Sequence, residues 1–268
     1  MNNHTAAASI GEGTYKPTIP DFLPYRENLV WYYDMAAASL YNAGSTEVKD
    51  AFSTDTMVVN NGTYSSDFGG GVYLNGTDAN LSGSASDKYK FNGHANNWTT
   101  ALIVSTGTLV NNQNQFLIDA DNSVTGIGWR IQLENSDSDS VRFWTYDGST
   151  VLEAKASDTY RMSSNKFYAV VLSKYTNNIV FQYRSADGGT GYALGGFGTG
   201  VNISSLDNGE KFVIGSSCNN ITGEYSNFTE VTVHAFMGWN TNIATMAGAV
   251  SQTAQQWTQA LADNYYAR

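Results

Sequence analysis

Cysteine is almost absent from this sequence of 268 residues, because Cys218 is the only one. Without a second thiol the chain cannot form an internal disulfide or a metal site built from several cysteines. Basic residues are also scarce, since 14 lysines and arginines stand against 24 aspartates and glutamates. Nucleic acids and anionic membrane surfaces are bound through clustered Lys and Arg side chains. The formal net charge of −10 therefore excludes both as partners.

Long hydrophobic runs are missing too, and no stretch approaches the roughly 20 apolar residues of a membrane span. The first residues, 1–8, have neither the basic region nor the apolar region of a signal peptide. We therefore expect a protein that is made in a cytoplasm and is not inserted into a membrane.

Proline is confined to one short segment, because all three prolines lie between positions 17 and 24. Proline fixes φ and favours an extended conformation in the residue before it. We therefore predict an extended N-terminal arm over residues 1–28, followed by one folded domain over residues 29–268. The arm would attach to a partner through these side chains: Tyr15, Pro17, Ile19, Pro20, Phe22, Leu23 and Pro24. The alternative is that the arm folds back along its own domain.

Aromatic residues, in contrast, are abundant, and 6 Trp, 17 Tyr and 12 Phe exclude a disordered chain. Beyond the arm, short apolar runs recur about every 8 to 12 residues, which is typical of an all-β sandwich or barrel. The two-residue period of a half-buried strand is clearest at three positions: Trp129, Ile131 and Leu133. The dipeptide Asp147-Gly148 predicts a tight hairpin between strands at 141–146 and 151–154.

The last segment has a helical pattern instead. Thr253 and Gln256 are spaced as in a capping box, which predicts the start of a helix. Apolar residues then recur every four positions, at Trp257, Leu261 and Tyr265, and give the helix one apolar face. We expect this short C-terminal helix to lie against the edge of the sandwich.

A series of short segments shares features with one known fold, in the same order along the chain. They include an aromatic opening strand at 31–34 and a Gly-Val-Tyr-Leu-Asn-Gly strand and turn at 71–76. The others are residues 98–104, 167–173, 179–183, 212–215 and 228–233. Together they resemble the concanavalin A-like jelly roll of laminin-G-type domains, over residues 29–268. The resemblance implies two curved antiparallel sheets with Greek-key connections, a fold shared by lectins, glycosidases and structural coat modules.

A catalytic motif of this fold is missing. The members that cleave β-glucans carry Glu-x-Asp-x-x-Glu on one strand, which points the carboxylates into one groove. The nearest acidic run, at 134–139, has the wrong spacing and the Ser/Asp composition of a turn. We therefore expect no enzyme activity and no cofactor.

Asp119, Asp121 and Asn122 follow a predicted strand at 116–118. Carboxylate and amide oxygens in such a loop are ligands for calcium, and some laminin-G-type domains bind calcium in this way. The loop lacks the glycine and the distal glutamate of an EF-hand, and Asp and Asn commonly close turns. We expect no metal site here, with calcium at these residues as the alternative.

Arg142, Trp144 and Tyr146 have the parity opposite to the apolar residues of the same strand, so they face away from the core. Together with the neighbouring Asp147 they are our candidates for binding a glycan or a protein. Aromatic rings stack on sugar rings, and Tyr, Trp and Arg are also enriched in protein interfaces. The sequence leaves both alternatives open.

The low-charge sandwich, the missing signal peptide and the extended arm together resemble bacteriophage virion proteins. Our first hypothesis is a non-enzymatic virion surface protein, made in the host cytoplasm, that decorates or cements a capsid through its arm. The partners would be capsid or other virion proteins, and a homotrimer is one alternative, since such surface proteins are conventionally trimers although no residue here specifies three. The alternative is a carbohydrate-binding adhesin, a receptor-binding lectin module of a tail or head fibre that binds a cell-surface glycan. A glycosidase is the third hypothesis.

Overall fold

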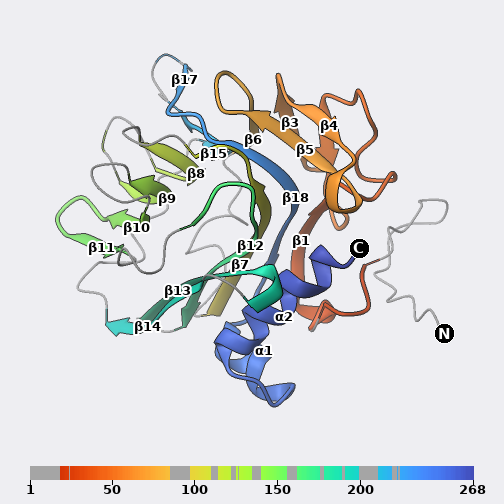
Figure 1. The fold of residues 1–268 in the computed structure, drawn as a ribbon. Coiled ribbons are helices and arrows are strands. Elements are labelled where there is room, and N and C mark those ends of the chain that lie inside the picture. Colours follow the sequence, from red (N-terminus) through yellow and green to blue (C-terminus); the bar gives the residue numbers. More distant parts are fainter. Residues whose placement is uncertain are drawn as a thin grey trace.

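Strands dominate the computed structural model, which describes residues 19–23, 25–84, 97–109, 114–121, 125, 127–134, 140–155, 162–175, 178–188, 191–198, 211–218, 222 and 224–268. They form two large antiparallel sheets that pack face to face, and two helices cover the outer face of one sheet (Figure 1). The predicted all-β sandwich with a C-terminal helix is confirmed.

The first sheet, sheet A, contains eight strands in the order β14-β13-β12-β7-β18-β5-β4, with β1 also paired to β18. Its strands are β1 (Leu29–Asp34), β4 (Thr63–Ser65), β5 (Gly71–Asn75), β7 (Asn97–Thr106), β12 (Phe167–Tyr175), β13 (Asn178–Ser185), β14 (Gly191–Gly198) and β18 (Glu230–Trp239). The long strands β7 and β18 pair although they lie far apart in the sequence. Sheet A is therefore assembled from segments that are distributed along the whole chain.

The second sheet, sheet B, also contains eight strands, in the order β11-β10-β9-β8-β15-β6-β3-β2. Its strands are β2 (Glu47–Lys49), β3 (Thr56–Asn60), β6 (Asn80–Ser84), β8 (Gln115–Asp119), β9 (Gly128–Glu134), β10 (Ser140–Tyr146), β11 (Val151–Lys155) and β15 (Lys211–Ile214). A small hairpin, β16 (Ser217–Cys218) with β17 (Tyr225–Ser226), follows β15. Short 3-10 helices are η1 (Arg26–Asn28), η2 (Asp67–Gly69) and η5 (Ala186–Gly188).

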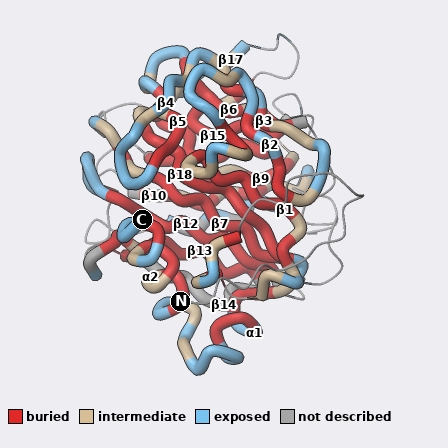
Figure 2. Tube along the Cα trace, turned by 90° about the vertical axis from the view of Figure 1, so that its right-hand side faces the viewer, coloured by how far each residue is buried: buried red, intermediate tan, exposed pale blue. Residues whose placement is uncertain are grey.

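A chain of aromatic rings links the two sheets across the core. Trp31, Trp98 and Phe236 of sheet A meet Trp129 and Phe212 of sheet B, with centroid distances of 5.0 to 6.2 Å. Each such pair contributes about 0.5–1.5 kcal/mol beyond the burial of its surface. Trp129 is only 1% exposed, as its predicted place in the core requires. In Figure 2 the buried residues accordingly follow the strands of both sheets.

A second apolar layer lies on the outer face of sheet A, where α1 (Ile243–Ala249) and α2 (Ala254–Tyr266) pack. The capping box of Thr253 and Gln256 is confirmed, and the predicted apolar face of α2 is buried. The helix packs across β12 and β13, so its predicted place at the sandwich edge is wrong. The reason is that the outer face of these strands carries apolar side chains, such as Val171, that need cover. No helix among the described residues is long and apolar enough to cross a membrane.

Residues 19–23 pack on this same layer, as the alternative of an arm that folds back along its own domain predicts. Ile19 is 9% and Leu23 is 2% exposed, and both belong to the core that α2 forms with sheet A. The half-buried ring of Phe22 lies edge-on to Tyr265, with the centroids 5.0 Å apart. Ile19 and Leu23 thus pack in their own domain, which favours the alternative of an arm that folds back, and attachment through the half-buried Phe22 stays a prediction. The core therefore includes residues before the predicted domain start at Leu29.

Pro20 is the remaining attachment residue that the structure describes. Pro20 begins a turn in which its carbonyl accepts the backbone N–H of Leu23 at 3.1 Å. Three predicted attachment residues lie outside the described residues: Tyr15, Pro17 and Pro24.

Candidate functional site

The candidate site lies on the outer face of sheet B, where β9, β10 and β11 run side by side. Because side chains alternate along a strand, the buried residues Trp129 and Phe143 leave Arg130 and Trp144 on the outside. The strand register then places Trp144 between Arg130 of β9 and Glu153 of β11. A local pattern of polar and apolar residues thus becomes a row of side chains across three strands.

The guanidinium of Arg130 contacts the side chains on both sides of it. Its Cζ lies 4.1 Å from the ring centroid of Trp144 and 5.4 Å from that of Phe116 on β8. Its Nη1 forms an ion pair with the carboxylate of Asp121 at 3.2 Å. A cation over an aromatic ring contributes about 0.5–2 kcal/mol, depending on its exposure to water. Arg130 therefore fixes the orientation of the Trp144 indole.

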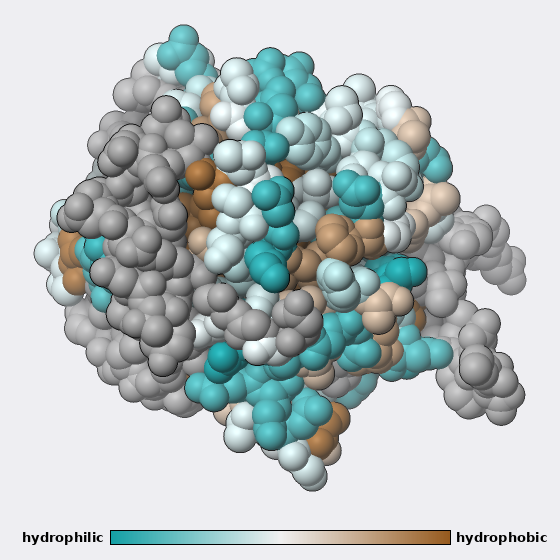
Figure 3. Space-filling model, viewed as in Figure 1, coloured by the Kyte–Doolittle hydropathy of each residue, from teal (hydrophilic) through white to brown (hydrophobic). Residues whose placement is uncertain are grey.

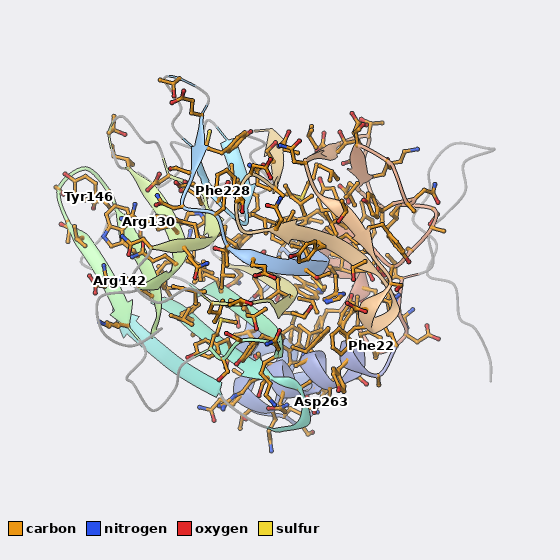
Figure 4. All side chains as sticks on the ribbon, turned by 45° about the horizontal axis from the view of Figure 1, so that its top comes forward. Phe22, Arg130, Arg142, Tyr146, Phe228 and Asp263 are labelled. Carbon is orange, nitrogen blue, oxygen red and sulfur yellow. The ribbon has the colours of Figure 1, made fainter. Side chains whose placement is uncertain are left out.

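Tyr146 and Arg142 extend the same face. The ring of Tyr146 lies 6.1 Å from that of Trp144, and its hydroxyl donates to the carbonyl oxygen of Gly148 at 2.8 Å. Nε of Arg142 lies 3.1 Å from a carboxylate oxygen of Glu153. Figure 4 shows Arg130, Arg142 and Tyr146 on the same side of the molecule. We call this surface the Arg130–Trp144 face, and it consists of Phe116, Arg130, Arg142, Trp144 and Tyr146.

Asp147 has a different role from the one that its neighbours suggest. The β10–β11 hairpin forms as predicted, with Tyr146 paired to Val151. Asp147 Oδ1 accepts the backbone N–H groups of Ser149 and Thr150, at 2.9 and 2.7 Å. These contacts close the turn, and Gly148 supplies its positive φ of 95°. Asp147 is thus a turn residue at the border of the face.

Asp119 and Asp121 lie at the other end of the face. The buried Asp119 accepts the backbone N–H of Cys218 at Oδ2, 3.1 Å away, and that of Asp121 at Oδ1, 3.3 Å away. Burial, and then the negative charge of Asp121, raises the pKa of Asp119 well above its usual range. Burial also raises the pKa of Asp121, although the ion pair with Arg130 opposes this. Contacts within the protein thus account for the position of both carboxyl groups.

The calcium alternative stays a prediction. Asn122, its third predicted ligand, lies outside the described residues. Within the part of the chain that the structure describes, no group of three or more His, Cys, Asp or Glu side chains could hold a metal ion.

Sequence reasoning missed two members of the face, Arg130 and Phe116. Arg130 could have been found, because its parity is opposite to that of Trp129 in the same strand. Its stacking on Trp144 depends on the register between β9 and β10, and its contact with Phe116 depends on the pairing of β8 with β9. Neither pairing follows from the residues of one strand.

No family model matches this chain, and a search of curated proteins finds no match. Solved structures do match. A mutant of Trypanosoma rangeli sialidase that displays trans-sialidase activity has a TM-score of 0.60 at 17% identity, covering 90% of this chain and 33% of that chain. A structure concerned with the cell entry of botulinum neurotoxin type C has a TM-score of 0.56 at 8% identity, covering 81% and 48%. The binding domain of botulinum neurotoxin DC in complex with rat synaptotagmin II has a TM-score of 0.55 at 9% identity, covering 81% and 49%.

This chain therefore spans about a third of the sialidases and about half of the neurotoxin chains. At such low identities the likeness shows the fold alone. That fold is a lectin-like β-sandwich, which agrees with the predicted resemblance to a concanavalin A-like jelly roll at this coarser level.

Proposed function

We propose that this chain is a non-enzymatic carbohydrate-binding protein and that its glycan lies against the Arg130–Trp144 face. The observation that carries the proposal is the half-buried pair of Trp144 and Tyr146 beside the guanidinium of Arg130. A pyranose ring has an apolar face that packs on aromatic rings. Guanidinium and carboxylate groups around such rings form charge-assisted hydrogen bonds with sugar hydroxyls.

The side chains of the Arg130–Trp144 face are ordered without a ligand. Its residues stand on paired strands, and Arg130 fixes the Trp144 indole from one side. Side chains that are already ordered lose little conformational entropy when a ligand binds. A sugar makes weak contacts, and the entropy lost in ordering the side chains would outweigh them. A preordered aromatic surface of this kind avoids that loss and therefore suits a sugar.

The structural neighbours support a glycan more than another small ligand. One neighbour is Trypanosoma rangeli sialidase in complex with sialic acid, and another is described by an interaction of botulinum neurotoxin type C with two ganglioside molecules. These ligands belong to those proteins. Their bearing on this chain is that proteins sharing its fold bind sugars.

A location on a bacteriophage virion is the finer part of the proposal, and it rests on the sequence features alone. Of the two virion hypotheses we favour the adhesin of a tail or head fibre over the capsid decoration protein. The decoration hypothesis depends on attachment through the arm, and Ile19 and Leu23 are buried in the chain's own core.

The test is a glycan array probed with the full chain, with Trp144→Ala and with Val58→Ala. Val58 is 40% exposed on β3 of the same sheet and is the matched control. We expect the full chain and the control to bind the same glycans, and Trp144→Ala to bind them roughly tenfold more weakly, because the lost ring no longer covers apolar sugar surface. Melting temperatures show that all three proteins are folded. Equal binding by Trp144→Ala and the control, or no binding by the full chain, would contradict the proposal.

A further inference from the structure

The two arginines of the Arg130–Trp144 face are each paired with a carboxylate. Nη1 of Arg130 forms its ion pair with the buried Asp121 at 3.2 Å, and Nε of Arg142 lies 3.1 Å from Oε1 of Glu153. Opposite charges at such distances attract each other strongly enough to hold both side chains in place. The positive charge of each arginine is therefore balanced within the protein before a ligand arrives.

Arg130 has little left to offer an acidic ligand. A guanidinium recognises a carboxylate best through two parallel N–H groups. A ligand carboxylate at Nη1 of Arg130 would compete with that of Asp121. Nε of Arg130 is buried and has no hydrogen-bond partner among the described residues, so a ligand does not reach it. Arg130 is thus suited to support the Trp144 ring, over which its Cζ lies, and is poorly suited to bind a ligand carboxylate.

The charged group that lies open beside the Trp144 ring is a carboxylate. The side chain of Glu153 is 39% exposed, compared with 20% for its partner Arg142. The strand register places Glu153 directly opposite Trp144, on the same side of sheet B. An ionised carboxylate only accepts hydrogen bonds. A ligand that lies on the Trp144 ring therefore meets a negatively charged acceptor at its side.

The other charged residues beside the face add no excess of positive charge. Lys155 is exposed and lies opposite Arg142 in the register of β10 and β11, and Asp147 closes the turn at the border of the face. These two residues add one charge of each sign. A ligand carboxylate would thus gain no net attraction from the described side chains, and Glu153 would repel it. The charges favour an uncharged ligand.

A neutral sugar fits this combination of groups. A hydroxyl both donates and accepts, so two neighbouring hydroxyls of a pyranose can donate to Glu153 and accept from Arg142. The apolar face of the same ring packs on Trp144 and Tyr146, whose centroids are 6.1 Å apart. Figure 3 shows hydrophobic and hydrophilic residues side by side at the left edge of the molecule, at the β10–β11 hairpin. A sugar, which is apolar on its face and polar at its rim, needs such a surface.

Building on the proposed function, we propose that the glycan on the Arg130–Trp144 face is uncharged and that Glu153 selects against sialic acid and other acidic sugars. The carboxylate of Glu153 accepts hydrogen bonds from the hydroxyls of a neutral sugar. The same carboxylate repels an acidic one. One side chain thus contributes both to affinity and to specificity.

The experiment is saturation-transfer NMR with methyl glucoside, methyl galactoside and methyl mannoside as neutral sugars and a methyl sialoside as the acidic sugar. The proteins are the full chain, Glu153→Gln, Trp144→Ala and Glu47→Gln. Glutamine at position 153 keeps the size of the side chain and removes its charge. Glu47 is exposed on β2, the strand at the opposite edge of sheet B, so Glu47→Gln is the matched control. Melting temperatures show that all four proteins are folded.

We expect at least one neutral hexoside to bind the full chain and Glu47→Gln alike, and to bind Glu153→Gln roughly tenfold more weakly, because a charge-assisted hydrogen bond is lost. Trp144→Ala should also weaken this binding roughly tenfold. The sialoside should bind the full chain at least tenfold more weakly than the hexoside, on the order of one repulsive contact. This preference should largely disappear in Glu153→Gln, because the repulsion is gone.

Sialoside binding that equals hexoside binding in the full chain and is lost in Trp144→Ala would overturn the inference and leave the proposed function standing. Hexoside binding that is unchanged in Glu153→Gln would also overturn it. Hexoside binding that is unchanged in Trp144→Ala would place the sugar elsewhere and contradict both proposals. Absence of binding by all four glycosides would overturn the inference as well, and the proposed function would fail with it only if the glycan array also showed no binding.

Discussion

His234 is buried on β18 in an arrangement that fits its neutral form. The carbonyl oxygen of Gly70 can only accept, so Nδ1 carries the proton and donates to it at 2.8 Å. Nε2 then accepts from the hydroxyl of Ser105 at 3.0 Å. Burial lowers the pKa of His234 to about 4, outweighing the hydrogen bond to Gly70 and the negative charges of Asp34 and Asp67. The folded protein therefore keeps this histidine uncharged over most of the acidic range.

The stability of the protein should consequently fall as the pH drops from about 6.5 to about 4. Over this range the unfolded chain protonates His234 and the folded chain does not, which favours unfolding. The total loss should be about 3 kcal/mol, at ~1.4 kcal/mol for each pKa unit, with no further loss from this group below pH 4. Urea unfolding at pH 7 and pH 4.5 measures it, with His234→Gln as the comparison. Equal losses in the two proteins would show that another group is responsible, because the carboxyl groups titrate in both.

The N-terminal segment and α2 stabilise each other. Leu23 is buried against the helix layer, and Tyr25 reaches the adjacent α1, where its hydroxyl donates to the carbonyl oxygen of Thr245 at 3.3 Å. Near its C-terminal end α2 is tied to β1, because the hydroxyls of Tyr265 and Tyr32 lie 3.0 Å apart and Tyr32 donates to Asp34 at 2.6 Å. Two segments from the start of the chain thus hold the helix layer on sheet A.

Replacing Leu23 by alanine should therefore destabilise the whole protein. Truncation of a buried leucine to alanine lowers the free energy of unfolding of a protein by about 2–5 kcal/mol, because a cavity remains. The matched control is Val250→Ala, since Val250 is 46% exposed after α1. Urea unfolding measures the difference, and hydrogen exchange should show faster exchange in α2. If Leu23→Ala behaves like the control, the segment is held loosely and attachment of the arm to a partner becomes the better interpretation.

The molecule as a whole has the Arg130–Trp144 face on the outside of sheet B and two helices on the outside of sheet A, with one apolar core between the sheets. The neighbouring carboxyl groups Asp119 and Asp121 contact backbone amides and Arg130, and Asp119 is only 4% exposed. A retaining glycosidase needs two carboxyl groups about 5–5.5 Å apart on either side of the scissile bond. This pair is not placed to flank a substrate.

We therefore expect the purified chain to release no reducing sugar from barley β-glucan or from laminarin. A reducing-end assay over a day at pH 5 and pH 7 measures this, with a known β-glucanase as the positive control. Asp121→Asn is the diagnostic variant if sugar is released. Release by the chain would contradict the non-enzymatic proposal: release that disappears in this variant would implicate Asp121, and release that persists in it would implicate a different carboxyl pair.

Much of the fold and part of the candidate site could be predicted from local patterns. The alternation of Trp129, Ile131 and Leu133 predicts a half-buried strand because successive side chains point to opposite faces. The same rule places Trp144 and Tyr146 outside, and the spacing of Thr253 and Gln256 marks the start of α2 because their hydrogen bonds are local. These signals involve residues a few positions apart, so the chain order already contains them.

The remaining features arise only where distant segments meet. The docking of Leu23 depends on α2, which lies more than two hundred positions away. Arg130 joins Trp144 through strand register, and Phe68 meets Tyr266 because η2 and the end of α2 reach the same part of sheet A. The prolines of the arm fit both an extended free segment and a docked one, since they restrict the backbone without selecting a partner. That selection depends on apolar area left uncovered on the outer face of sheet A, and this area exists only once the sheet has formed.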